Sequence, residues 1–119
     1  MPGNARLLRT RRLRRRGEFT DTMKSGSRSR DACFSIYACR SALPFAQLGV
    51  TVSRRVSPKA VSRNRIKRQI RESFRRHQDL LSGVRVVVAA QPAASANDNR
   101  QLQMSLSKHW ERIAKQQRQ

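Results

Sequence analysis

The sequence has few acidic residues, few cysteines and no long apolar run. Its 119 residues include only 7 Asp and Glu against 27 Lys and Arg, which leaves a formal net charge of +20. No apolar stretch approaches the ~18 residues of a membrane-spanning helix, and no apolar segment follows the basic start as it would in a secretion signal. We therefore exclude an integral membrane protein, and we expect a cytoplasmic protein with an acidic partner and no membrane partner.

The sequence offers few side chains for covalent or metal chemistry. Cys33 and Cys39 are the only cysteines, and on one extended strand they would be roughly 20 Å apart, too far for a disulfide. The only histidines are His77 and His109, and the seven acidic residues are scattered along the chain. A zinc site, paired carboxylates for magnesium and a histidine pair for acid and base catalysis are therefore not indicated. We expect no catalytic residue and no metal ligand in this chain.

The length and charge distribution predict one domain with basic flanks. A mass of 13.7 kDa is typical of a single domain, and a hydrophobic content of 37% predicts a small core. Residues 1–16 contain seven arginines and no hydrophobic period, which indicates a flexible basic arm. We therefore predict an arm over 1–16, one RNA-binding domain over 17–116 and a short tail over 117–119.

Hydrophobic periodicity predicts six elements in the order α-β-β-α-β-α. The long middle helix is predicted to open at Ser57-Pro58, with serine as the cap, and the final helix at a capping box of Asp98 and Gln101. The predicted ranges are a helix at 18–24, strands at 32–39 and 47–54, a helix at 57–77, a strand at 84–90 and a helix after 98. This order predicts an α+β sandwich in which helices cover one mixed sheet of three to four strands.

The first predicted strand carries two aromatic rings on different faces. Alternation places Phe34, with Ile36 and Ala38, on one face and Tyr37 on the other. Each ring could stack on an unpaired RNA base or pack in the core.

The segment from Arg54 to Arg76 holds ten basic residues and one acid, Glu72. Ile66, Ile70 and Phe74 recur every four residues and predict one apolar stripe. On a helical wheel a basic arc lies opposite this stripe and consists of Arg65, Arg68, Arg75 and Arg76, flanked by Lys67 and Arg71, whereas Arg63 falls near the stripe. The alternative is a solvated face in which Glu72 pairs with Arg68 or Arg76, but one acid cannot neutralise so many cations. Arginine binds phosphate with two hydrogen bonds, so the segment favours a nucleic-acid partner, and the aromatic strand favours RNA.

Two stretches of the chain resemble a known signature. Residues 49–55 read Gly-Val-Thr-Val-Ser-Arg-Arg, and residues 59–75 contain Arg-Asn-Arg followed by Ile-Lys-Arg-Gln-Ile-Arg-Glu-Ser-Phe-Arg. Together they resemble the protein subunit of bacterial ribonuclease P, over about residues 6–118. The resemblance implies a ribonucleoprotein endonuclease that removes the 5′ leader of precursor tRNA. It also implies a left-handed βαβ crossover around the basic helix, hydrolysis by the RNA subunit with bound Mg²⁺, and no obligate protein partner.

The resemblance also implies two sets of binding residues. Those matching the surface that binds the RNA subunit are Arg54, Arg55, Arg63, Asn64, Arg65, Lys67, Arg68 and Arg71. Those matching a cleft that holds the single-stranded leader are Phe19, Met23, Phe34 and Tyr37. Met23 stands where the family usually has an aromatic residue, so a thioether contact replaces one ring.

Three other functions remain as alternatives. The first is a ribosomal or RNA-chaperone protein, which would associate with ribosomal subunits and not with one RNA of several hundred nucleotides. A nuclease acting alone would need the catalytic groups that the sequence lacks. A membrane-active peptide would need a broader apolar face than the basic helix has.

Overall fold

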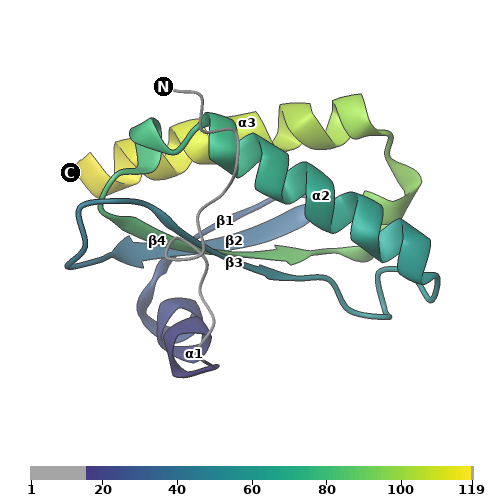
Figure 1. Ribbon diagram of the computed structural model, residues 1–119, viewed down its shortest axis with the longest axis horizontal. Coiled ribbons are helices and arrows are strands. Elements are labelled where there is room, and N and C mark those ends of the chain that lie inside the picture. Colours follow the sequence, from purple (N-terminus) through teal and green to yellow (C-terminus); the bar gives the residue numbers. More distant parts are fainter. Residues whose placement is uncertain (1–15, 119) are drawn as a thin grey trace.

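The computed structural model describes residues 16–118 as one sheet with helices on both faces (Figure 1). The elements are α1 (Arg16–Ser25), β1 (Ser27–Arg30), β2 (Phe34–Arg40), β3 (Gln47–Thr51), α2 (Ala60–Arg76), η2 (Asp79–Leu81), β4 (Val84–Ala90), η3 (Pro92–Ala96) and α3 (Asn99–Arg118). The predicted arm lies outside the described residues except for Arg16, which begins α1. Residues 117 and 118, predicted as tail, end α3. Within residues 16–118, no helix is both long and apolar enough to cross a membrane.

The sheet is mixed, as predicted, and has four strands in the order β1-β2-β4-β3. β2 pairs antiparallel with β1 and β4, whereas β3 and β4 are parallel neighbours joined through α2. β1 was not predicted, because it contains only serine and arginine and so has no apolar alternation. This strand forms because its backbone pairs with β2 at the edge of the sheet.

The core lies between the sheet and the pair α2 and α3 (Figure 1). The predicted stripe of α2, Ile66, Ile70 and Phe74, is fully buried. Trp110 of α3 meets Phe74 edge to face, with ring centres 5.9 Å apart. Its indole N–H donates a 2.8 Å hydrogen bond to Ser73 Oγ, so the buried polar atom of the ring is satisfied.

The two long helices begin differently. α3 begins at the predicted capping box, where the Gln101 N–H donates to Asp98 Oδ1 at 2.8 Å and the Asp98 N–H donates to Gln101 Oε1 at 2.9 Å. The predicted start of α2 at Ser57-Pro58 was wrong, because the helix begins at Ala60 with Lys59 as its N-cap. Ser57 Oγ accepts the Lys59 N–H at 3.2 Å, a local turn that competes with a helical cap.

A buried polar cluster ties α3 to the edge strand β1. His109 Nδ1 lies 2.7 Å from Ser29 Oγ, and Arg112 donates to the same oxygen at 3.1 Å. The Ser29 hydroxyl therefore donates to Nδ1, which assigns the ring proton of neutral His109 to Nε2. Nε2 lies 3.1 Å from Asp31 Oδ2, which also accepts a 2.5 Å hydrogen bond from Ser105.

The environment shifts the pKa of both titratable groups in this cluster. Burial lowers the pKa of His109, and the Arg112 charge adds to this effect, although Asp31 opposes it. Burial raises the pKa of Asp31, but hydrogen bonds from Ser105 and the backbone N–H groups of Phe34 and Cys33 outweigh it, so the net shift is downward. The cluster is therefore built for neutral His109 and ionised Asp31.

We expect the free energy of unfolding to fall as the pH is lowered from 7 to 5. Unfolded histidine, with a pKa of about 6.5, binds a proton more readily than folded His109, so acid favours the unfolded chain. A second decline is expected below about pH 4, because the pKa of Asp31 is lowered in the folded protein and the unfolded chain therefore takes up this proton first. Urea unfolding at several pH values measures both. His109→Gln should flatten the first decline only, and an unchanged slope between pH 7 and 5 would contradict the assignment.

Candidate nucleic-acid interface

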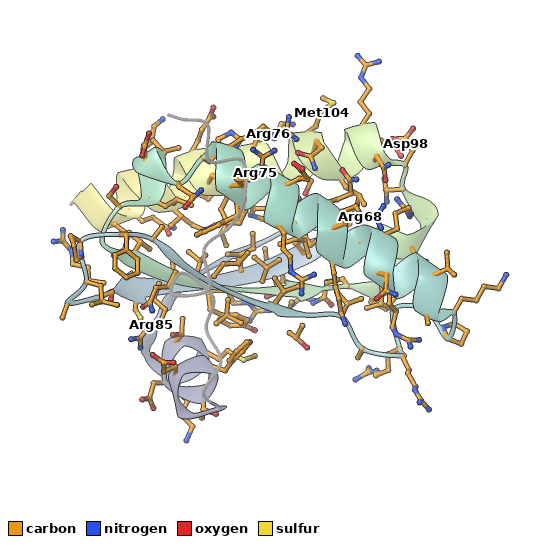
Figure 2. The ribbon with its side chains drawn as sticks, in the orientation of Figure 1. Arg68, Arg75, Arg76, Arg85, Asp98 and Met104 are labelled. Atoms are coloured by element: carbon orange, nitrogen blue, oxygen red, sulfur yellow. The ribbon has the colours of Figure 1, made fainter. Side chains whose placement is uncertain are left out.

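The buried stripe of α2 determines which of its basic residues face outward. Asn64 and Arg68 are exposed, and Lys67 and Arg71 are half-buried on the flank of the helix. Arg68, labelled in Figure 2, makes no hydrogen bond or ion pair with any described residue. We call the set Asn64, Lys67, Arg68 and Arg71 the α2 ridge.

Arg63 and Arg65 both make hydrogen bonds within the protein. The Arg63 guanidinium donates a 2.9 Å hydrogen bond to the carbonyl oxygen of Ser57, which holds the connection into α2. Arg65 was predicted on the outward arc, but it reaches sideways to the start of α3. It donates to Asn99 Oδ1 at 2.8 Å and to the Asn97 carbonyl at 3.1 Å. Both arginines therefore position the helix that carries the α2 ridge.

Glu72 forms an ion pair with one arginine of α2, and this partner differs from the two considered in the alternative of a solvated face. Its carboxylate pairs with Arg75 at 2.5 Å, three residues further on, and not with Arg68 or Arg76. This hydrogen bond from Arg75 is the main reason that the pKa of Glu72 is lowered. Arg76, also predicted on the outward arc, donates instead to Gln103 of α3 at 3.0 Å. Fewer arginines of α2 are therefore free of partners within the protein than the helical wheel predicted, because Arg75 and Arg76 both bond to neighbouring residues.

Arg54 and Arg55 project from the turn that follows β3. Both side chains are exposed, whereas Val52 and Val56 on either side are buried in the core. The turn is closed by the Val56 N–H, which donates to the Ser53 carbonyl at 3.0 Å. Two anchored valines thus hold a pair of arginines at the surface near the beginning of α2.

α1 lies on the face of the sheet opposite α2 and α3 (Figure 1). Glu18 forms a 3.5 Å ion pair with Arg85 of β4, and the Cys39 thiol donates to Thr22 Oγ1 at 3.7 Å. Glycine is required at position 26, where a Cβ would lie 2.5 Å from the Thr22 carbonyl oxygen. Only glycine lets the chain pass this closely from α1 into β1.

Aromatic and apolar side chains are present on this α1 side of the sheet, because α1 carries Phe19 and Met23, and Tyr37 lies on the same face of β2 as Cys39, which contacts α1. Tyr37 and Phe19 are half-buried, and Met23 is 40% exposed. The guanidinium carbon of Arg28 lies 5.9 Å from the centre of the Tyr37 ring, and its Nε donates to Ser35 at 3.3 Å. We call the set Phe19, Met23, Arg28 and Tyr37 the α1-side surface. Arg28 was not predicted, although the Ser-Arg alternation of β1 was the signal that could have found it.

The prediction that Phe34 lines the same surface was wrong. Its ring is fully buried in the core between the sheet and α2 and α3. In the β2–β4 register, Phe34 pairs with Ala90 and Tyr37 with Val87, so the two rings lie on opposite faces. Strand alternation requires this separation. The Phe34 ring is not exposed, so it cannot stack on an RNA base.

Comparison with known proteins identifies relatives along most of the chain. The family model for ribonuclease P matches residues 7–114. The ribonuclease P protein component of Nitrosococcus oceani is 34% identical over 84% of each chain, and that of Methylococcus capsulatus is 38% identical over 86% of this chain and 80% of its own.

Solved structures resemble the fold over the same region. The RNase P protein of Staphylococcus aureus superposes with a TM-score of 0.80 and 32% identity, covering 88% of this chain and 95% of its own. The RNase P protein of Thermotoga maritima gives a TM-score of 0.77 and 29% identity, covering 86% and 96%. The helix and sheet arrangement described above is therefore shared with these proteins.

We expect Arg65→Ala to lower the free energy of unfolding by about 1–2 kcal/mol, because it removes hydrogen bonds that join α2 to the start of α3. Arg68→Ala removes the same side chain from an unpartnered position and should change stability by less than about 0.5 kcal/mol. Urea unfolding of the two variants makes the comparison. Equal losses would show that Arg65 does not hold these elements together.

Proposed function

The chain belongs to the ribonuclease P protein family, and on this premise we propose that it acts in tRNA 5′ maturation by binding two RNAs at once. The α2 ridge, with Arg54 and Arg55, binds the catalytic RNA subunit. The α1-side surface binds the 5′ leader of precursor tRNA. Binding both promotes the magnesium-dependent endonucleolytic removal of the leader.

The observation that carries this proposal is the outward, unpartnered charge of Arg68 on α2. Arg68 has no hydrogen-bonding or ionic partner among the described residues, and burial of Phe74 and Ile70 prevents the helix from turning it inward. Phosphate groups of folded RNA supply the missing negative charge, and their neutralisation lowers the magnesium needed to hold the RNA compact. In this proposal Arg63 and Arg65 assist by positioning α2.

The α1-side surface suits a single strand. Tyr37 and Phe19 offer ring faces for unpaired bases, and Arg28 beside Tyr37 offers a guanidinium for the adjoining phosphate. Mature tRNA lacks the leader and loses these contacts. Precursor is therefore bound more tightly than product, which favours product release.

The protein alone is proposed to be non-catalytic, with Mg²⁺ bound mainly by the RNA subunit. Among residues 16–118 there is no group of three or more His, Cys, Asp or Glu side chains that could hold a metal ion. The donor set of this part of the chain does not fit a magnesium centre, because Mg²⁺ prefers clustered oxygen ligands. The protein contributes binding and orientation.

The first test is cleavage of a 5′-labelled precursor tRNA at low Mg²⁺ by a bacterial ribonuclease P RNA, with and without the protein. We expect accurate cleavage only when both are present, because the protein replaces part of the magnesium that the RNA needs. If the protein binds this RNA no better than a random RNA and restores no cleavage, the ribosomal or chaperone function becomes the better explanation.

A second test separates the two surfaces. Lys67→Gln with Arg68→Gln should weaken binding of the RNA subunit about tenfold and reduce the slope of log K against log salt by roughly 1.4–1.8. Tyr37→Ala should leave that affinity within about twofold but lower the preference for precursor over mature tRNA by about fivefold or more, because it removes a stacking ring. Tyr37→Phe keeps the ring and serves as the control. Equal effects on assembly would contradict two separate surfaces.

A further inference from the structure

A groove lies between the C-terminal end of α2 and the outward face of α3. Its volume is about 400 Å³, and it is lined by Arg76, His77, Arg100, Gln103, Met104, Ser107 and Lys108. Figure 2 shows Arg76 and Met104 on this side of the molecule, whereas Arg85 marks the opposite side near α1. None of the lining residues belongs to the α2 ridge or the α1-side surface.

The groove is strongly basic. Arg76, Arg100 and Lys108 line it, and no acidic residue does. Arg100 and Lys108 are exposed and make no hydrogen bond or ion pair with any described residue. The acids near these residues in the sequence are Glu72, which is paired with Arg75, Asp98, which caps α3 two residues before Arg100, and Glu111, one turn beyond Lys108. An anionic ligand is therefore electrostatically favoured.

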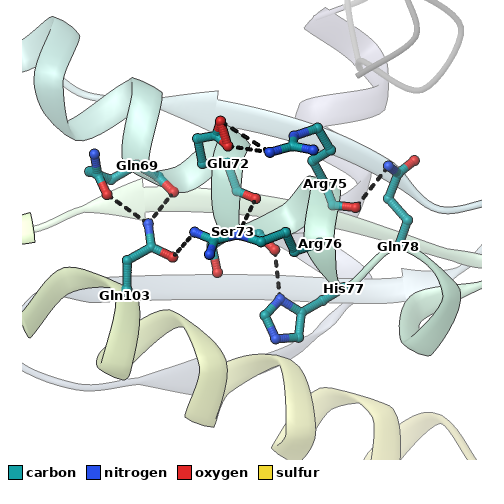
Figure 3. Close-up of polar contacts among 8 residues, drawn as sticks. All are labelled: Gln69, Glu72, Ser73, Arg75, Arg76, His77, Gln78 and Gln103. Atoms are coloured by element: carbon teal, nitrogen blue, oxygen red, sulfur yellow. Dashed lines mark hydrogen bonds and ion pairs between the residues drawn. The ribbon is translucent and has the colours of Figure 1, made fainter. Parts of the chain in front are cut away.

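A hydrogen-bond relay holds Arg76 in place at the wall of the groove (Figure 3). The side-chain amide of Gln103 donates to Gln69 at its carbonyl oxygen (3.0 Å) and at Oε1 (2.7 Å). Gln103 Oε1 accepts Arg76 Nη2 at 3.0 Å, and Arg76 Nε faces the Glu72 carbonyl oxygen at 3.4 Å. Nη1 makes no hydrogen bond with a described residue. The guanidinium is thus oriented in advance, which reduces the entropy lost when it binds a phosphate.

Met104 gives the groove an apolar centre. Its side chain is 55% exposed, on the turn of α3 between Arg100 and Lys108. A large exposed apolar side chain with a cation one turn away on each side suits a nucleotide, whose phosphates meet the cations while its base covers the thioether.

We propose that this groove is a second binding site for the RNA subunit, in which Arg76, Arg100 and Lys108 bind successive phosphates and Met104 contacts a base. The proposal rests on the proposed function and extends it. The RNA subunit is the occupant because α2 carries both sets of residues: the α2 ridge ends at Arg71, and Arg76, which lines the groove, follows five residues later on the same helix. The leader, by contrast, is proposed to lie across the sheet on the α1 side (Figure 1).

The first test is photo-crosslinking in the reconstituted holoenzyme, with a photoreactive amino acid in place of Met104 and labelled precursor tRNA present. A crosslink to the RNA subunit is expected. A crosslink to the precursor alone, or to neither RNA, would overturn the proposal, and so would a crosslink that appears only with an added acidic protein.

The second test compares two variants that each remove two charges. Arg100→Gln with Lys108→Gln should weaken RNA-subunit binding about tenfold and reduce the salt slope by roughly 1.4–1.8, as expected for two lost phosphate contacts. Lys24→Gln with Lys115→Gln removes the same charge from exposed positions outside the groove, on α1 and at the end of α3. It should change the affinity by less than about threefold, because only long-range attraction is reduced.

The two proposals can fail separately. If changes at Lys67 and Arg68 weaken assembly while the groove variant matches its control, the groove proposal is wrong and the proposed function stands. If the unmodified protein neither binds the RNA subunit specifically nor restores cleavage, the proposed function itself has failed.

Discussion

The packing of α2 and α3 on one face of the sheet is the contact on which the other features depend. Burial of Ile66, Ile70 and Phe74 sets the rotation of α2 about its axis, and Trp110 locks α3 beside it through an edge-to-face contact and a hydrogen bond. Once the apolar stripe is buried, the 3.6-residue period of the helix sets the side of α2 from which each polar side chain starts. The outward position of Arg68 is therefore a consequence of hydrophobic burial, and no partner is needed to create it.

The arginines of this small protein fall into two groups: some make hydrogen bonds that hold the fold together, and others leave their charge at the surface. Arg63 and Arg65 use the several donors of the guanidinium to satisfy oxygen acceptors where α2 begins and where α3 begins. Arg68 keeps its donors free among the described residues. Arg76 lies between these classes, because Gln103 orients it and one of its nitrogens remains available. The positive charges of a chain with a net charge of +20 repel one another, and this repulsion destabilises the folded state. Binding to a polyanion reduces the repulsion and so stabilises the fold.

Residue patterns predicted the helices, strands and caps well, and they predicted less well which surface each side chain belongs to. The stripe of α2, the strand at Val84–Ala90 and the capping box of Asp98 and Gln101 were all predicted and confirmed. Strand alternation also separated Phe34 from Tyr37, whereas the family resemblance assigned both to one surface. The structure follows the alternation, because side chains of a strand point to alternate faces whatever the function of the protein.

The helices and their buried faces, most of the sheet and the family can be predicted from the sequence, since these depend on periodicity and on a long contiguous signature. Three features depend on how the elements pack together: β1 joins the sheet, Arg65 turns to Asn99, and Gln103 connects Gln69 with Arg76. A helical wheel gives the angle of a side chain but not the element packed beside it. Contacts between residues about thirty positions apart arise from that packing, and local patterns do not contain it.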